Sequence, residues 1–138
     1  MPKRPTAFDV RSTFVHFGLG AVAVPLEGFS WEQEYLERYQ RETELDGAEG
    51  RLLSVTPHTA SWESWERHPA GDELVLVLSG LLTLVQEIEG AEHRITLGPM
   101  QAVINPRDVW HTADVLEVGE ALYLTPGLGT QKRLRAPG

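Results

Sequence analysis

Two clusters of side chains in this sequence could together bind a metal ion. Glu66 and His68 are one residue apart, Glu73 follows a Pro-Ala-Gly turn at 69–71, and His111 lies about forty positions further on. On a strand, residues i and i+2 point to the same face, so Glu66 and His68 would project together and the turn would bring Glu73 back to them. The chain has no cysteine, which excludes disulfides and thiolate ligands. Two carboxylates and two imidazoles would form a mixed site for Fe, Mn, Zn or Ni with an open coordination position.

The first cluster has the spacing of a known family motif. Glu66-x-His68, four residues, Glu73, six residues and Gly80 resemble the first motif of the cupin superfamily, which is His-x-His, three or four residues, Glu, six residues and Gly. Glu66 replaces the first histidine of that motif. The resemblance implies a cupin jelly-roll β-barrel over roughly residues 51–126 and one divalent metal ion held by the ligand set Glu66, His68, Glu73 and His111.

The second cluster resembles the second cupin motif less closely. Pro106-Arg107-Asp108, two residues and then His111 stand where the family has Pro-x-Gly, two residues and His. Asp108 can replace the turn glycine because Asp tolerates a left-handed backbone conformation. The glycine that usually opens this motif is replaced by Met100.

The elements that must position these residues are short strands. From residue 51 onward, segments of roughly 5–8 residues alternate with turns, which is typical of an all-β sandwich or barrel. The predicted strands are 51–57, 60–67, 73–79, 81–88, 92–97, 100–105, 109–116 and 119–125. This pattern predicts an all-β fold with one short N-terminal helix, and the resemblance to cupins implies that the fold is a jelly-roll barrel.

The N-terminal region is predicted to pack on this barrel. Residues 12–18 and 20–26 have strand composition, and a helix is expected after Ser30, which has capping-box spacing to Gln33. Trp31, Tyr35 and Tyr39 would form one buried stripe of that helix. The predicted organisation is an arm, strands and helix at 1–50, the barrel at 51–126, and a C-terminal tail at 127–138.

Composition excludes several classes of function. The formal net charge is −8, which argues against binding nucleic acid. No stretch approaches the ~18 apolar residues of a membrane helix, and the first residues lack the apolar region of a signal peptide, so a cytoplasmic location and no membrane partner are expected.

The remaining aromatic residues and histidines are assigned by strand parity. Trp62 shares parity with Glu66 and would line the pocket, whereas Trp65 and Trp110 would face a second layer or a partner subunit. His16, His58 and His93 have no motif partner and are expected to be structural or exposed.

The sequence leaves two functions open. The first is a metal-dependent enzyme on a small organic molecule, an oxygenase, isomerase or lyase, in which Glu66 is either a metal ligand or the catalytic general base. The acidic ligand set would favour a neutral or cationic substrate. The alternative is a non-catalytic small-molecule binding or sensor cupin that has lost the metal. Leu74–Leu78 is apolar on both faces, which favours a homodimer with N-terminal strands pairing across subunits.

Overall fold

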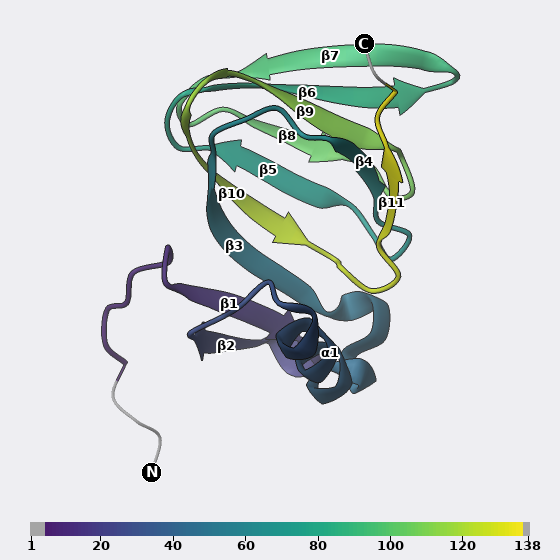
Figure 1. Cartoon of the computed structure of the whole chain (residues 1–138). Coiled ribbons are helices and arrows are strands. Elements are labelled where there is room, and N and C mark those ends of the chain that lie inside the picture. The colour runs from purple at the N-terminus through teal and green to yellow at the C-terminus, as the bar shows by residue number, and fades with distance from the viewer. Residues whose placement is uncertain (1–4, 137–138) are drawn as a thin grey trace.

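The fold consists of two antiparallel β-sheets and one α-helix. The structure is a computed structural model, and it describes residues 5–136. The larger sheet has the strand order β2-β1-β3-β10-β5-β8 and the smaller sheet the order β11-β4-β9-β6-β7. The two sheets face each other and enclose the core, as the predicted jelly-roll class requires (Figure 1). The all-β prediction with one short N-terminal helix is confirmed.

The observed elements lie close to the predicted segments. In chain order they are β1 Thr13–Gly18, β2 Val22–Glu27, α1 Gln33–Glu42, β3 Arg51–His58, β4 Ser64–Arg67, β5 Glu73–Val77, β6 Leu81–Ile88, β7 Ala91–Leu97, β8 Ala102–Asn105, β9 His111–Glu117, β10 Gly119–Thr125 and β11 Gln131–Leu134. A short 3₁₀ turn, Leu19–Ala21, joins β1 to β2, and another, Glu44–Glu49, follows α1. Among residues 5–136, no helix has the length and apolarity needed to cross a membrane.

The core lies between the sheets and alternates along each strand. Val75 and Val77 of β5 face Leu82 and Leu84 of β6, and all four are fully buried. Leu74 and Leu76, on the other face of β5, are only half-buried. The prediction that this strand is apolar on both faces is therefore accurate, but only its inner face is covered within one chain.

Positive φ angles mark four of the turns that join the strands. Glu89 and Gly90 both have positive φ and connect β6 to β7 by the tight hairpin that their sequence predicts. Gly80 also has positive φ, and a Cβ there would lie 2.5 Å from the carbonyl oxygen of Glu117, so only glycine fits. Asp108 and Met100 have φ values of 63° and 66°, which shows that each takes the left-handed conformation of the glycine it replaces.

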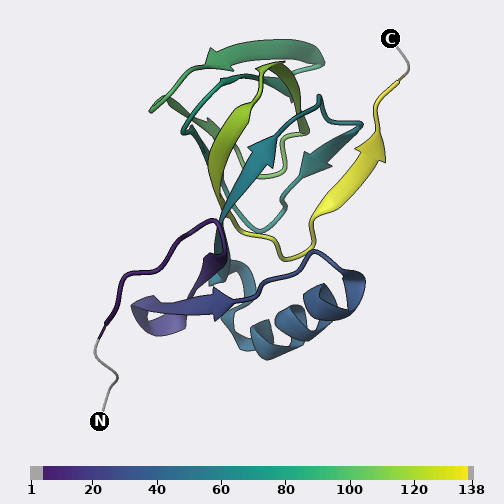
Figure 2. The ribbon, with the colours of Figure 1, turned by 60° about the vertical axis from the view of Figure 1, so that its left-hand side comes forward.

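The N-terminal strands extend the larger sheet of their own chain. β1 pairs with β3, where Val15 lies opposite Leu53, His16 opposite Leu52 and Phe17 opposite Arg51. β2 pairs with the other edge of β1. Figures 1 and 2 show that β1, β2 and α1 form a layer at one end of the two sheets. A single chain thus provides the strand pairing that was expected between subunits, and the homodimer stays a prediction.

Helix α1 differs from the prediction in two respects. It begins at Gln33 with Glu32 as N-cap residue, and no side chain caps it. Ser30 instead accepts a hydrogen bond from the backbone N–H of Glu32, so the capping box does not form. No helix residue is fully buried and Trp31 is 56% exposed, so the predicted buried stripe is wrong. Its aromatic residues gather around the ring of Phe29, beside the helix.

The segment 127–138, predicted as a tail, contains strand β11. Its last two residues, like residues 1–4 of the predicted N-terminal arm, lie outside the described part of the chain. β11 pairs with β4, and Arg133 packs over the rings of both Trp65 and Trp110, with 4.6 Å between its guanidinium carbon and the Trp110 ring centroid. Trp65 thus faces away from the core, as parity predicts, and this strand forms the layer that covers it.

Candidate metal centre and cavity

The four predicted residues converge because of the register between strands. Glu66 of β4 lies directly opposite His111 of β9, and His111 lies opposite Gln86 of β6, so these side chains form a row across one face of the smaller sheet. His68 follows Glu66 by two residues and shares its side. Glu73 enters from the larger sheet, where it lies opposite Asn105 of β8.

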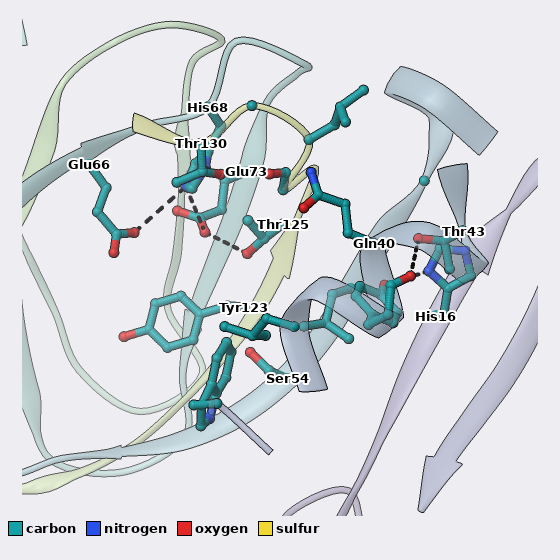
Figure 3. Close-up of a pocket in the computed structure, with 18 of the residues that line it drawn as sticks. His16, Gln40, Thr43, Ser54, Glu66, His68, Glu73, Tyr123, Thr125 and Thr130 are labelled. Carbon is teal, nitrogen blue, oxygen red and sulfur yellow. Dashed lines mark hydrogen bonds and ion pairs between the residues drawn. The ribbon is translucent and has the colours of Figure 1, made fainter. Parts of the chain in front are cut away.

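Three of these residues form a group that could hold a metal ion. Glu66, His68 and His111 each offer one ligand atom, and the three atoms all lie within 4.8 Å of one another. His68 and His111 are buried, whereas Glu66 is half-buried and also lies 3.4 Å from the ammonium of Lys132. Figure 3 shows Glu66, His68 and Glu73 pointing toward one another at one side of the pocket.

Glu73 is held by donors on both of its oxygens. Asn105 donates to Oε1 at 3.0 Å, and Thr125 donates to Oε2 at 2.6 Å. Gln86 donates in turn to the side-chain oxygen of Asn105, which fixes the orientation of that amide. Each oxygen of Glu73 also lies 3.3 Å from a histidine Nε2, Oε1 from that of His111 and Oε2 from that of His68.

The histidine tautomers follow from the partners of Nδ1. In His111, Nδ1 lies 3.3 Å from the carbonyl oxygen of Val109, which can only accept, so Nδ1 carries the proton. In His68, Nδ1 lies 2.8 Å from the hydroxyl oxygen of Thr130, whose proton is donated to the carbonyl of Gly127, so Nδ1 is again the donor. In the neutral ring each Nε2 atom therefore presents a lone pair to the site, as metal-ligating histidines do.

These lone pairs are buried without a hydrogen-bond partner. Among the described residues, Nε2 of His68 and Nε2 of His111 form no hydrogen bond of acceptable geometry. Each faces an oxygen of Glu73, which is also an acceptor. Burial alone would raise the pKa of the Glu73 carboxyl, and hydrogen bonds and positive charge from His111 and His68 lower it when their Nε2 atoms carry protons. When the Nε2 atoms are unprotonated, a cation placed between the carboxylate and the two lone pairs would supply that positive charge.

The site opens into a cavity of about 800 Å³. Its walls are largely apolar and include Phe29, Leu36, Leu52, Trp62 and Leu128. The prediction that Trp62 lines the pocket is confirmed. Burial, with smaller effects of the Glu73 and Glu66 charges, raises the pKa of the Tyr123 phenol above its ordinary value, so this lining residue stays a neutral hydrogen-bonding group. The volume lies within the roughly 300–1,000 Å³ typical of small-molecule sites.

Sequence reasoning missed the residues that surround the metal centre. Asn105, Thr125 and Thr130 lie outside the four-residue pattern, and only Asn105 carries a usable signal, as a polar residue at the end of an otherwise apolar strand.

The other three histidines differ from one another. His93 is exposed, His58 is buried outside the cavity, and His16 is buried and lines the far side of the cavity.

Comparisons with known proteins find similar solved structures and name no activity for this chain. No protein-family model matches the sequence, and no curated protein matches it. Similar solved structures include a cupin-2 domain protein from Shewanella frigidimarina, at 20% identity and TM-score 0.48 over 55% of this chain and 70% of that one. A cupin superfamily protein from Desulfitobacterium hafniense has 22% identity and TM-score 0.47 over 54% and 65% of the two chains. Hydroquinone 1,2-dioxygenase from Sphingomonas sp. TTNP3 has 11% identity and TM-score 0.47 over 54% and 58%.

These likenesses concern the fold of about half of the chain. Over that length the chain is similar to cupin structures, as the two sequence motifs predict. At this level of identity the likeness says nothing of the reaction, so the functional argument depends on the site itself.

Proposed function

We propose that this chain binds one divalent metal ion at Glu66, His68, Glu73 and His111 and holds a small organic molecule in the adjoining cavity. The observation that supports this most strongly is the pair of buried, unpartnered Nε2 atoms facing the Glu73 carboxylate. Two buried lone pairs that face carboxylate oxygens with no donor between them are destabilising, and a cation removes that cost. Fe, Mn, Zn and Ni all accept this ligand set.

The chain's own residues have distinct tasks in this proposal. Thr130 and the carbonyl of Val109 orient the two imidazoles, and Asn105 and Thr125 orient Glu73. A metal bound there would supply Lewis-acid or redox chemistry for an oxygenase, isomerase or lyase. Glu66 is the most exposed member of the set and borders the cavity, so it is placed either to complete the ligand set or to take a proton from a bound molecule.

The alternative is a binding barrel without metal, and one contact favours it. Lys132 lies 3.4 Å from Glu66 and already offers that carboxylate a cation. If Nε2 of both histidines were also protonated, imidazolium groups would satisfy Glu73. Such a site would hold a ligand by hydrogen bonds alone.

Elemental analysis separates the two functions. Protein produced without a metal-affinity tag should contain close to one equivalent of Fe, Mn, Zn or Ni, and Glu66→Ala should reduce this content if Glu66 is a ligand. Glu66→His should restore it, because an imidazole can take the same position. Retention of full metal content in Glu66→Ala would show that Glu66 is not a ligand and would leave proton transfer as its proposed task. Wild-type protein that neither contains nor takes up metal contradicts the proposal and supports the binding barrel.

A further inference from the structure

A second buried histidine cluster lies at the other end of the cavity. His16 of β1 has Nδ1 at 2.5 Å from the hydroxyl of Tyr39 in α1 and Nε2 at 2.6 Å from Oδ2 of Asp46, in the turn after α1. His16 and Tyr39 line the same cavity as Glu66, His68 and Glu73. Figure 3 shows His16, Gln40 and Thr43 on one side of this pocket, and Glu66, His68 and Glu73 on the other.

The direction of each hydrogen bond in this cluster follows from the Asp46 carboxylate. Oδ1 of Asp46 accepts the backbone N–H of Leu19, and the hydrogen bonds from His16 and Leu19 lower the pKa of the Asp46 carboxyl. Asp46 is therefore an acceptor, and Nε2 of His16 carries the proton that it accepts. Burial, together with the Asp46 charge, raises the pKa of the Tyr39 phenol above its ordinary value, so Tyr39 keeps its hydroxyl proton.

The hydroxyl of Tyr39 then offers either a donor or an acceptor to the cavity. When His16 is neutral, Tyr39 donates its proton to Nδ1 and its oxygen is free to accept from a ligand. When His16 is protonated, Nδ1 donates to the Tyr39 oxygen, and the phenol proton is free for a ligand. An alcohol or phenol hydroxyl fits both states because it can donate and accept. A carboxylate fits only the second state and is repelled by Asp46.

We propose that Tyr39, positioned by His16 and Asp46, is a recognition site for a hydroxyl group of the bound molecule. The ligand would have a metal-binding group at the Glu66–His111 end, an apolar middle against Trp62 and Leu52, and a hydroxyl at the α1 end. This inference rests on the proposed function for the first of these groups. The hydroxyl site itself depends only on the three-residue cluster and the cavity.

A series of straight-chain hydroxamic acids tests the proposal. Hydroxamates chelate divalent metals, and their chains can end in hydroxyl, methyl or carboxylate at each of several lengths. Binding is followed by quenching of tryptophan fluorescence, since Trp62 lines the cavity, with and without Zn²⁺. At the length that spans the cavity, the hydroxyl probe should bind about fivefold more tightly than the methyl probe, which is the value of one net hydrogen bond. The carboxylate probe should show no such gain.

Variants distinguish recognition from a structural role of the cluster. Tyr39→Phe should abolish the preference for hydroxyl over methyl, so that the two probes bind this variant with equal affinity. Tyr35→Phe is the matched control, because Tyr35 lies on the same helix and contacts Phe29, and it should keep the preference. Asp46→Asn should reduce the preference, since His16 then loses the carboxylate that fixes its orientation.

Several outcomes would overturn the inference. Equal affinities of the hydroxyl and methyl probes at every length, or a preference that survives Tyr39→Phe, would each do so, as would the absence of binding of any probe both with and without Zn²⁺. If chelation of the metal abolishes the binding of every probe, this result tests the proposed metal centre and not the hydroxyl site. The ratio of hydroxyl to methyl affinity, measured in metal-free protein, still tests the Tyr39 site if the metal centre fails.

Discussion

The two ends of the cavity use the same residue types and differ in how donors match acceptors. At the α1 end, the Asp46 carboxylate accepts from His16, and the remaining nitrogen of His16 has the Tyr39 hydroxyl as its partner. At the other end, the Glu73 carboxylate faces two histidine lone pairs, and no donor stands between them among the described residues. The comparison teaches that the two clusters, although alike in residue types, differ in whether a donor lies between the histidine nitrogens and the carboxylate, and this difference supports metal binding only at the Glu73 end.

The largest effect should follow from removing an imidazole at the metal end. His111→Gln should lower the affinity for Zn²⁺ or Mn²⁺ by more than about 100-fold, because a direct ligand contributes more than its outer partners. Calorimetric titration measures this, and circular dichroism checks the fold. His93→Gln, on the exposed face of β7, is the control and should bind as wild type does. Equal metal affinities of His111→Gln and His93→Gln would contradict the proposed difference between the two ends of the cavity.

Metal binding should also stabilise the fold. Free Zn²⁺ at about 100 times its Kd should add about 2.7 kcal/mol to the free energy of unfolding. For a chain of 138 residues this corresponds to a rise in Tm of about 5–10 °C. Differential scanning calorimetry should show the rise in wild type and in His16→Gln but not in His111→Gln. An equal rise in all three proteins would place the metal elsewhere.

A smaller effect is expected from the partner that orients His68. Thr130→Val keeps the shape of the side chain but removes the oxygen that accepts from Nδ1. Because such outer partners are worth 10–100-fold in metal affinity, the variant should bind Zn²⁺ about tenfold more weakly. Thr96→Val on β7 is the matched control. Unchanged affinity in Thr130→Val would mean that the tautomer of His68 is not set by this contact.

The smallest effect concerns the acid stability of the α1 end. Asp46 has a pKa below its ordinary value of 3.8 in the folded protein, mainly because His16 donates to it. Its stabilising contribution is therefore present above that ordinary pKa and is lost as the pH falls through the folded pKa. Urea unfolding midpoints at pH 6 and pH 3 should show a smaller acid loss in Asp46→Asn than in wild type. An identical loss would mean that other carboxylates account for the acid sensitivity.

The sequence predicts the barrel end of the molecule better than the α1 end. Strand alternation and turns such as Glu89-Gly90 are local signals, and they placed most strands of the two sheets within a few residues. Parity along β4 and β5 also brought Glu66, His68 and Glu73 together. These features depend on spacing within short segments, which a single sequence contains.

The rest depends on contacts between distant segments. His16, Tyr39 and Asp46 come from three elements, so nothing in their spacing indicates that they meet. Thr130 lies in a segment predicted as a tail, because the strand that follows it, β11, is polar and is ordered chiefly by pairing with β4 and by Arg133 on Trp65. The prediction of a buried stripe was wrong because Trp31, Tyr35 and Tyr39 pack on the half-buried ring of Phe29 and not on the core between the sheets.

The position of Thr130 just before β11 has a consequence for the order in which the site is assembled. A chain leaves the ribosome from its N-terminus onward, and Glu66, His68, Glu73 and His111 all emerge before Thr130. Until β11 pairs with β4, the imidazole of His68 lacks its hydroxyl partner and is free to rotate. A chain that has emerged only as far as His111 would therefore hold metal at the proposed site more weakly than one in which β11 is paired, which links the timing of metal capture to the synthesis of this strand.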